Sequence, residues 1–596
     1  MKGKNIYKRF IIWRLRHTQE HVFVWVLSVV VGVCAGVAAA VLKTGVHAVN
    51  KFLLQFDATN FLGANWLMLL YPAVGIMLTI LFVRYVVRGD IGHGLPSVLL
   101  AISRKKGYLP AKNMWSSLVA STITVAFGGS VGLEAPIAST GSAIGSNIGR
   151  FFRVSQQSIK LLLGCGAAGA IAGIFNAPIA GVFFVVEVFL FDLSKTSAIA
   201  LLLSSISASA TGFFLMGNEV QFAFAVEEAF ALGQIPFYVV LGVFCALVSV
   251  YFLRTTDRVE GWLAKVRRPA DRLLVGGLVL GLLIFLFPPL FGEGYSFLSD
   301  LLRGSTESLF QHSVFQPYGE MPWVVLLMLF ALILLKAVAT AVTIGSGGVG
   351  GTFGPSLIVG GLSGYLVAML CNQIGLPEQS TANFALVGMA AVMTGVMQAP
   401  FMAVLLIAEI TGGYALIVPL LIASAITMVC VSPFESHSIY ARKLAKKGDL
   451  LTHDKDQSAW QLIDMKRLIE TNFVVVREGD KLGDLVEAIK YSRRNVFPVL
   501  TSDDKFLGVI HLDSVRQVMF QPELYKVACL DEYMYPVSEA DIVYLSTAPQ
   551  EVVDRFRNSD RYNLIVLDDD GTYLGILSRA NIFSAYRQFI SKVSEE

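Results

Sequence analysis

Two glycine-rich segments of the sequence combine residue types that could bind an anion. The first reads GGSVGLEAP and contains Glu134 and Pro136, and the second reads GGVGGTFGP and ends at Pro355. Glycine permits tight turns and a close approach of the backbone, and proline is tolerated in the first turn of a helix. Each segment therefore predicts a helix start, where unpaired N–H groups and the positive end of the helix dipole form an anion site.

Glu134 is the first candidate for a functional side chain. A carboxylate in an apolar, glycine-rich segment is costly and usually functional, although a structural hydrogen-bond partner is the alternative. Uncharged backbone donors suit transport, because they bind an anion strongly enough to admit it and weakly enough to release it.

The composition predicts a membrane protein that positions these segments within a bilayer. The chain has 596 residues, of which 55% are hydrophobic and 15% charged, and its mean hydropathy is +0.63. A soluble protein of this size needs more polar surface. Runs long enough to cross a bilayer include Val22–Leu42, Trp66–Val87, Leu273–Phe291 and Trp323–Val342. We expect an N-terminal segment at 1–21, a membrane domain at 22–445 and a soluble domain at 446–596.

The basic residues predict the topology. Clusters next to the first and last apolar runs comprise Lys2, Lys4, Lys8, Arg9, Arg14 and Arg16, and Arg442, Lys443, Lys446 and Lys447. The positive-inside rule places both termini in the cytoplasm, and in a prokaryote the protein would lie in the plasma (inner) membrane. The six cysteines show neither a metal-binding spacing nor a disulfide framework.

The membrane domain contains an internal repeat. GIFNAPIAGVFFVVEV at 173–188 resembles GVMQAPFMAVLLIAEI at 395–410, which matches Glu187 with Glu409. The two glycine-rich segments, which end at Pro136 and Pro355, are related by almost the same spacing. We therefore expect halves at roughly 22–218 and 235–445. With both termini on one side, an odd number of crossings per half makes the repeats antiparallel, with a substrate site near the midplane between broken helices.

The C-terminal region has a different periodicity. FPVLTSDDKFLGVIHL at 497–512 and LIVLDDDGTYLGILS at 564–578 each predict a strand, an acidic turn and a second strand. Helical stretches precede both segments. This predicts two αβ repeats, at about 462–520 and 530–590.

Four separated motifs show that the chain resembles the CLC family of chloride channels and chloride/proton exchangers. GHGLP at 92–96 is similar to the family's GSGIP, GLEAP at 132–136 to GREGP, GGTFGP at 350–355 to GGxFxP, and EITGGY at 409–414 to EMTxxY. The C-terminal repeats resemble a pair of CBS domains. The resemblance implies an all-α polytopic inverted-repeat bundle with an α/β CBS pair, and one pore in each subunit of a homodimer.

The resemblance also assigns roles to single residues. It implies that Glu134 is a gating glutamate, whose carboxylate competes with chloride and leaves the pathway when protonated. Leu133, Glu134, Thr352 and Phe353 would offer backbone N–H groups. The full set implied to bind the anion is His93, Gly94, Leu133, Glu134, Thr352, Phe353 and Tyr440.

Several of these positions depart from the family pattern. Leu133 replaces a basic residue and Ala135 a glycine, and neither change removes a backbone donor. His93 stands where many members have a serine, so the preference among chloride, nitrate, bromide and fluoride stays open; a solvated loop histidine is the alternative. Ser436 aligns with the family's pore tyrosine, and Tyr440, one helical turn later, is a candidate that could equally be a core tyrosine.

The pair Glu187-Val188 bears on the transport mechanism. Exchangers commonly carry a second glutamate at the position of Val188, which hands protons inward, and valine cannot do so. This favours passive, Glu134-gated conduction; an antiporter without that glutamate is the alternative. A CBS-containing cation channel would need more intramembrane carboxylates. We expect no enzyme activity, because no GxSxG elbow or His/Asp metal cluster is present, and no nucleic-acid partner.

The CBS pair could bind an adenine nucleotide. The positions that contact the ribose in such pairs hold His511 and Ser514 in the first repeat, and Ser578 and Asn581 in the second. Neither repeat keeps the acidic ribose ligand, so a structural or dimerising role is the alternative. No cofactor is required, and chloride is the expected substrate.

Overall fold

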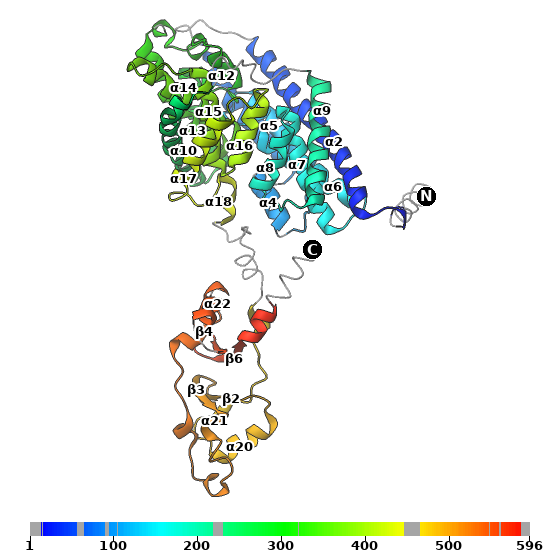
Figure 1. Ribbon diagram of the computed structural model, residues 1–596, viewed down its shortest axis with the longest axis vertical. Helices are drawn as coiled ribbons and strands as arrows, with labels where there is room; N and C mark the ends of the chain where they lie inside the picture. Colours follow the sequence, from blue (N-terminus) through cyan, green and yellow to red (C-terminus); the bar gives the residue numbers. More distant parts are fainter. Residues whose placement is uncertain are drawn as a thin grey trace. The chain divides into compact units, whose positions relative to one another are not determined.

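The computed structural model describes residues 14, 16–55, 65–89, 94–103, 105–217, 230–319, 321–445, 465–547, 549–558 and 562–585. The chain folds as two compact units, Met1–Leu450 and Leu451–Glu596, which are coloured blue to yellow and orange to red in Figure 1. His93 lies outside the described residues.

The first unit consists of helices. Those of its first half are α2 (Glu20–Leu54), α3 (Tyr71–Leu81), α4 (Leu95–Ser103), α5 (Ser116–Ala126), α6 (Glu134–Phe151), α7 (Gln156–Phe175), α8 (Pro178–Val188) and α9 (Lys195–Met216). Those of its second half are α10 (Ile235–Ala264), α11 (Pro269–Leu286), α12 (Tyr295–Leu302), α13 (Pro322–Gly345), α14 (Phe353–Gln373), α15 (Thr381–Met397), α16 (Pro400–Ile410), α17 (Ile417–Val431) and α18 (Ile439–Ala445). Figure 1 shows α12 at one end of this unit and α4 and α18 at the opposite end.

The helix lengths suit a bilayer. In the described part of the chain, seven helices are long and apolar enough to cross a membrane. The 35 residues of α2 extend over about 52 Å, more than the roughly 30 Å of a hydrocarbon core. Proline within the first turn of α8, α10, α11, α13 and α16 marks their starts, where its missing N–H costs nothing.

Glycines let equivalent helix pairs of the two halves pack closely. A Cβ atom at Gly141 of α6 would lie 2.1 Å from the carbonyl oxygen of Gly166 in α7. A Cβ atom at Gly360 of α14 would likewise lie 2.4 Å from the carbonyl oxygen of Gly388 in α15. Small residues permit such contacts between membrane helices. The repeat found in the sequence is therefore a repeat of structure.

Glu187 and Glu409 fix the relative direction of the two repeats. Glu187, near the end of α8, accepts hydrogen bonds of 3.1 and 2.7 Å from the first-turn N–H groups of α16. Glu409, near the end of α16, accepts bonds of 2.9 and 2.8 Å from the first-turn N–H groups of α8. The end of each helix therefore lies beside the start of the other, so α8 and α16 are antiparallel, as an inverted repeat requires.

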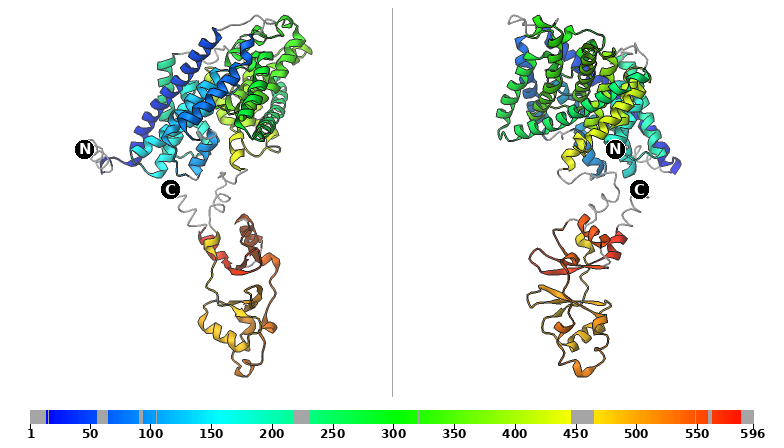
Figure 2. Two further views of the ribbon diagram at one scale, coloured as in Figure 1. Left: turned by 180° about the vertical axis from the view of Figure 1, so that it is seen from behind. Right: turned by 60° about the vertical axis from the view of Figure 1, so that its left-hand side comes forward.

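The second unit contains two similar sheets, seen from two further sides in Figure 2. One has the order β1 (Val476–Arg477), β2 (Val496–Leu500), β3 (Phe506–His511), and the other β4 (Ile542–Tyr544), β5 (Asn563–Leu567), β6 (Tyr573–Ser578). The helices of the described residues include α20 (Leu482–Tyr491), α21 (Leu512–Val515) and α22 (Pro549–Asn558). In each sheet the first pair of strands is parallel and the second antiparallel. The two predicted strand–turn–strand segments are thus confirmed.

The two sheets pack against each other through apolar side chains. Val509, Ile565 and Ile576 belong to one buried cluster that both sheets contribute to. The rings of Phe506 and Tyr573, at equivalent positions, stack with their centroids 6.1 Å apart. The pair is therefore one folded unit with internal pseudo-symmetry.

Candidate functional site: a buried carboxylate between two cavities

Two cavities lined by described residues of the first unit lie near Glu134. One, of about 580 Å³, is lined by the end of α2 and by the chain around the start of α12, and we call it the α12-side cavity. The other, of about 550 Å³, is lined by the glycine-rich segment before α14 and by α18, and we call it the α18-side cavity.

Glu134 lies between the two cavities. Leu133, which precedes it, lines the α12-side cavity. Ala135 and Pro136, which follow it, line the α18-side cavity. The Glu134 side chain itself is only 1% exposed. A buried carboxylate thus separates two spaces that small solutes could fill.

Two donors hold the Glu134 carboxylate. The Tyr295 hydroxyl donates to Oε1 at 2.5 Å, and the N–H of Gly354 donates to Oε2 at 3.2 Å. Gly354 lies in the first turn of α14, so the carboxylate occupies the positive end of that helix. These two contacts hold the carboxylate in its inward position.

A backbone bridge joins the two glycine-rich loops. Gly132 and Gly351 exchange two N–H···O hydrogen bonds, each of 2.8 Å. A Cβ atom at Gly132 would lie 2.1 Å from Glu134 Oε2, and one at Gly351 would lie 2.7 Å from the Cβ of Ala135. The two helix starts therefore meet at one place only because both positions lack a side chain.

The α18-side cavity brings together predicted anion-binding residues. Gly94, Thr352 and Tyr440 line it. The hydroxyls of Thr352 and Tyr440 are buried and have no hydrogen-bond partner of normal geometry among the described residues. Phe353 is fully buried, and its ring stacks on Phe175 with the centroids 5.8 Å apart. Two hydroxyl groups that could donate to an anion therefore line a cavity beside the start of α14.

Ser436 and Val188 lie elsewhere. The Ser436 hydroxyl contacts His437 Nδ1 at 2.8 Å in an exposed position and does not line the α18-side cavity, whereas Tyr440 lines it. Val188 is 5% exposed, packs in the apolar core and lines neither cavity.

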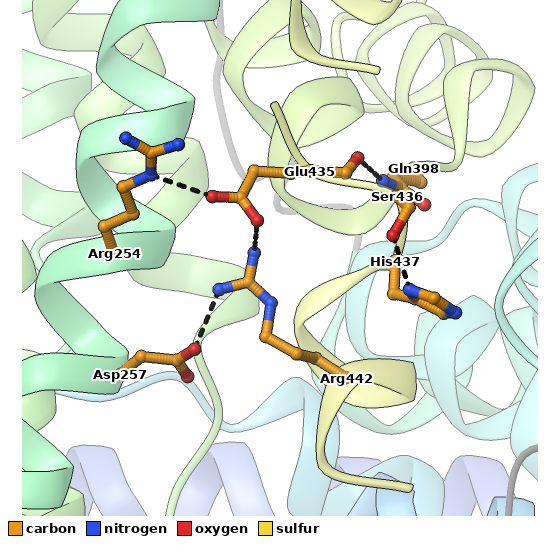
Figure 3. Close-up of polar contacts among 7 residues, drawn as sticks. All are labelled: Arg254, Asp257, Gln398, Glu435, Ser436, His437 and Arg442. Carbon is orange, nitrogen blue, oxygen red and sulfur yellow. Dashed lines mark hydrogen bonds and ion pairs between the residues drawn. The ribbon is translucent and has the colours of Figure 1, made fainter. Parts of the chain in front are cut away.

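An ion-pair network anchors α18, the helix that carries Tyr440 (Figure 3). The Arg442 guanidinium donates to Asp257 Oδ2 at 2.8 Å and pairs with the Glu435 carboxylate. Arg254 Nε binds the same carboxylate at 3.0 Å. The Arg442 side chain is only 12% exposed, whereas that of Arg254 is 47% exposed. Arg442 is thus better shielded than Arg254, and its contact with Asp257 joins α18 to α10.

Two functional candidates were missed from the sequence. Glu293 Oε1 accepts a hydrogen bond of 3.2 Å from the N–H of Leu133, and Glu293 lines the α12-side cavity. Lys336, in the middle of α13, is 1% exposed and donates to the carbonyl oxygen of Gly292 at 3.0 Å. The indications were an acid between two glycines in FGEGY and one lysine inside an apolar run.

The candidate nucleotide positions of the second unit make local contacts. Ser578 Oγ accepts a hydrogen bond from the N–H of Asn581 at 3.2 Å, and the Asn581 amide donates to Glu470 at 2.7 Å. Ser514 Oγ donates to the carbonyl oxygen of His511 at 2.6 Å. The structure brings Ser578 and Asn581 together and leaves the amide of Asn581 occupied.

The fold and the site define a membrane protein of inverted repeats whose central site lies between interrupted helices. The chain matches the family described as voltage gated chloride channel over residues 74–432, and the CBS domain over 465–520 and 535–588. It belongs to the voltage gated chloride channel (CLC) family. The predicted family and fold class are therefore confirmed.

Named relatives include both channels and exchangers. A chloride channel protein of Ralstonia nicotianae, named for its likeness to ClcB, is 31% identical and covers 64% of this chain and 87% of its own. An H(+)/Cl(-) exchange transporter, ClcA, of Vibrio cholerae is 27% identical over 70% of this chain and 88% of its own.

Solved structures share the fold. A slow cyanobacterial Cl-/H+ antiporter superposes with a TM-score of 0.61 at 24% identity, covering 72% of this chain and 98% of its own. A eukaryotic CLC transporter superposes with a TM-score of 0.58 at 18% identity, covering 94% of this chain and 98% of its own.

Proposed function

We propose that this chain transports chloride and other small anions passively across a membrane, through a pathway in each subunit of a homodimer that opens when Glu134 is protonated. The observation that carries the proposal is the position of Glu134, buried between two cavities at the start of α14. We assign the membrane domain to 22–445 and the CBS pair to 446–596, with both termini in the cytoplasm.

The ionised carboxylate would close the pathway by competition. It accepts the N–H of Gly354 at the positive end of α14, where a chloride ion would bind for the same electrostatic reason. Protonation removes the negative charge and with it most of the attraction to that amide. The neutral side chain then gives way, and the anion takes the vacated position.

The α18-side cavity would supply the next anion site. The hydroxyls of Thr352 and Tyr440 are buried donors without a partner of normal geometry among the described residues. Together with the N–H groups of Thr352 and Phe353 they would replace lost water ligands. Because none of these donors is charged, an anion that binds there can also leave.

Val188 favours conduction over exchange. Its buried apolar side chain stands where exchangers commonly have a second glutamate, and it cannot carry a proton. The alternative is a chloride/proton antiporter in which protons reach Glu134 by another route. The exchange transporter among the relatives supports this alternative.

Flux in liposomes separates the two mechanisms. Purified protein in vesicles with a chloride gradient should release chloride when a potassium ionophore balances the charge, and an internal pH dye should report no proton movement. Uphill proton uptake driven by the chloride gradient would establish exchange. No chloride release at all would refute anion transport.

A further inference from the structure

We propose that Glu293 is a second gating carboxylate, which occupies the start of α6 on the α12 side and must leave that amide before an anion from this side reaches Glu134. The inference rests on the proposed anion transport. It adds a residue that the sequence motifs do not point to.

The geometry repeats that of Glu134. Glu134 binds an amide at the start of α14, and Glu293 binds the N–H of Leu133, the residue that caps α6, at 3.2 Å. Each of the two helix starts that could receive the anion therefore holds a carboxylate. Leu133 and Glu293 both line the α12-side cavity. An anion in that cavity therefore finds the Leu133 N–H already bound to the Glu293 carboxylate.

The two carboxylates differ in access. Glu293 is partly exposed and lines the α12-side cavity, whereas Glu134 is 1% exposed. The hydroxyl of Tyr295, two residues after Glu293, holds the carboxylate of Glu134. From the α12 side, Glu293 is therefore met first and Glu134 second.

The charges around Glu293 suit an anion as well as a carboxylate. The charged groups that act on it come from three helices: Lys43 of α2, Lys336 of α13 and Glu134 of α6. Tyr295 of α12 is the neighbouring titratable hydroxyl. The other titratable groups that line the cavity are His47, Asp300 and His312. When the Glu293 carboxylate is neutral or displaced, the two lysines and the Leu133 amide remain to attract a halide.

The opposing interpretation is that Glu293 only caps α6. In that case its removal lowers the thermal stability of the protein and leaves the chloride dependence of transport unchanged. A gating role predicts a change in the chloride dependence of transport and in the steepness of its pH dependence. A capping role leaves both unchanged.

The test compares full-length Glu293→Gln, Glu134→Gln and Asp300→Asn in liposomes. Chloride flux is measured against chloride concentration, with equal pH on both sides, across the range in which carboxylates titrate. Asp300→Asn is the matched control, because it removes one negative charge from the same cavity without releasing the Leu133 amide.

We expect wild-type flux to rise on acidification with a pH dependence as steep as two protonation events require. In Glu293→Gln the pH dependence should be only as steep as one protonation event requires. Glu293→Gln should also lower the half-saturating chloride concentration by about threefold to tenfold, because a charged competitor for one amide is gone. Asp300→Asn should behave as wild type. In Glu293→Asp the shorter side chain no longer reaches the Leu133 amide but still titrates. This variant should therefore lower the half-saturating chloride concentration and retain the pH dependence of two protonation events.

Unchanged steepness and unchanged half-saturation in Glu293→Gln and Glu293→Asp would overturn the proposal, as would an equal effect of Asp300→Asn. Failure of the proposed function looks different. There the wild type carries no anion flux, or Glu134→Gln retains the full pH dependence of the wild type.

Discussion

Glu187 and Glu409, equivalent residues of the two repeats, each cap the helix that carries the other. The carboxylate of Glu187 binds the start of α16, and that of Glu409 binds the start of α8. Each contact satisfies two N–H groups that a helix leaves unpaired and places a negative charge at the positive helix end. The two repeats are thus fastened to each other by a symmetric pair of side chains.

The symmetry of this pair predicts equal losses of stability. Glu187→Gln and Glu409→Gln should each destabilise the protein by about 1–2 kcal/mol, because a neutral amide interacts less with the helix dipole and accepts through one oxygen only. Thermal unfolding in detergent measures this. The exposed Glu378→Gln is the control. A loss confined to one of the two variants would contradict reciprocal capping.

Glu134→Gln should make chloride flux less dependent on pH, so that only the pH dependence due to Glu293 remains. Under the proposed mechanism, acid protonates the wild-type carboxylate and opens the pathway, so flux rises as pH falls. The glutamine side chain is permanently neutral and resembles the protonated form of Glu134 at every pH. Flux measured at neutral pH should therefore exceed that of the wild type at the same pH. A variant that is closed at all pH values would show that the carboxylate is needed for the path itself.

Tyr440→Phe should weaken anion binding from the α18 side. Loss of one buried hydroxyl donor should raise the half-saturating chloride concentration by about threefold to tenfold. Ser436→Ala is the matched control, because Ser436 aligns with the family's tyrosine but its hydroxyl contacts His437 at an exposed place. If Ser436→Ala raised the half-saturating chloride concentration and Tyr440→Phe did not, the hydroxyl donor would be Ser436 and not Tyr440.

Arg442→Met should loosen α18. Removing this shielded cation leaves Asp257 and Glu435 without their shared partner, and we expect a loss of about 2 kcal/mol in unfolding free energy. The half-saturating chloride concentration should rise with it, because Tyr440 lies on the same helix. Arg254→Met, which removes an exposed partner of Glu435, should cost less than 1 kcal/mol, or roughly half of the Arg442 effect. Equal effects would refute the anchoring role of Arg442.

The sequence was sufficient for the repeat and for the helix starts. Glu134 and Phe353 are the first residues of α6 and α14, where the glycines and prolines of the two segments placed them. These features are local, because turn-forming and helix-starting residues act within a few positions along the chain. The same holds for the strand–turn–strand segments of the second unit.

The contacts of Glu293 and Lys336 could not be obtained in this way. Lys336 sits inside the apolar run Trp323–Val342, where a single lysine hardly changes the average hydropathy. Its partner, the carbonyl of Gly292, comes from a loop 44 residues earlier, and the amide that Glu293 binds lies 160 residues earlier. Such pairs depend on how distant helices pack, and a single sequence carries no record of that.

Gly132 makes the proposed gate sensitive to a single substitution. Any other residue there brings at least a methyl group to the place where the Glu134 carboxylate lies, 2.1 Å from its Oε2. The added Cβ atom would displace the carboxylate, and it would also lie 2.8 Å from the backbone nitrogen of Gly354. A single substitution at Gly132 would therefore disturb both the proposed gate and the junction of the two helix starts.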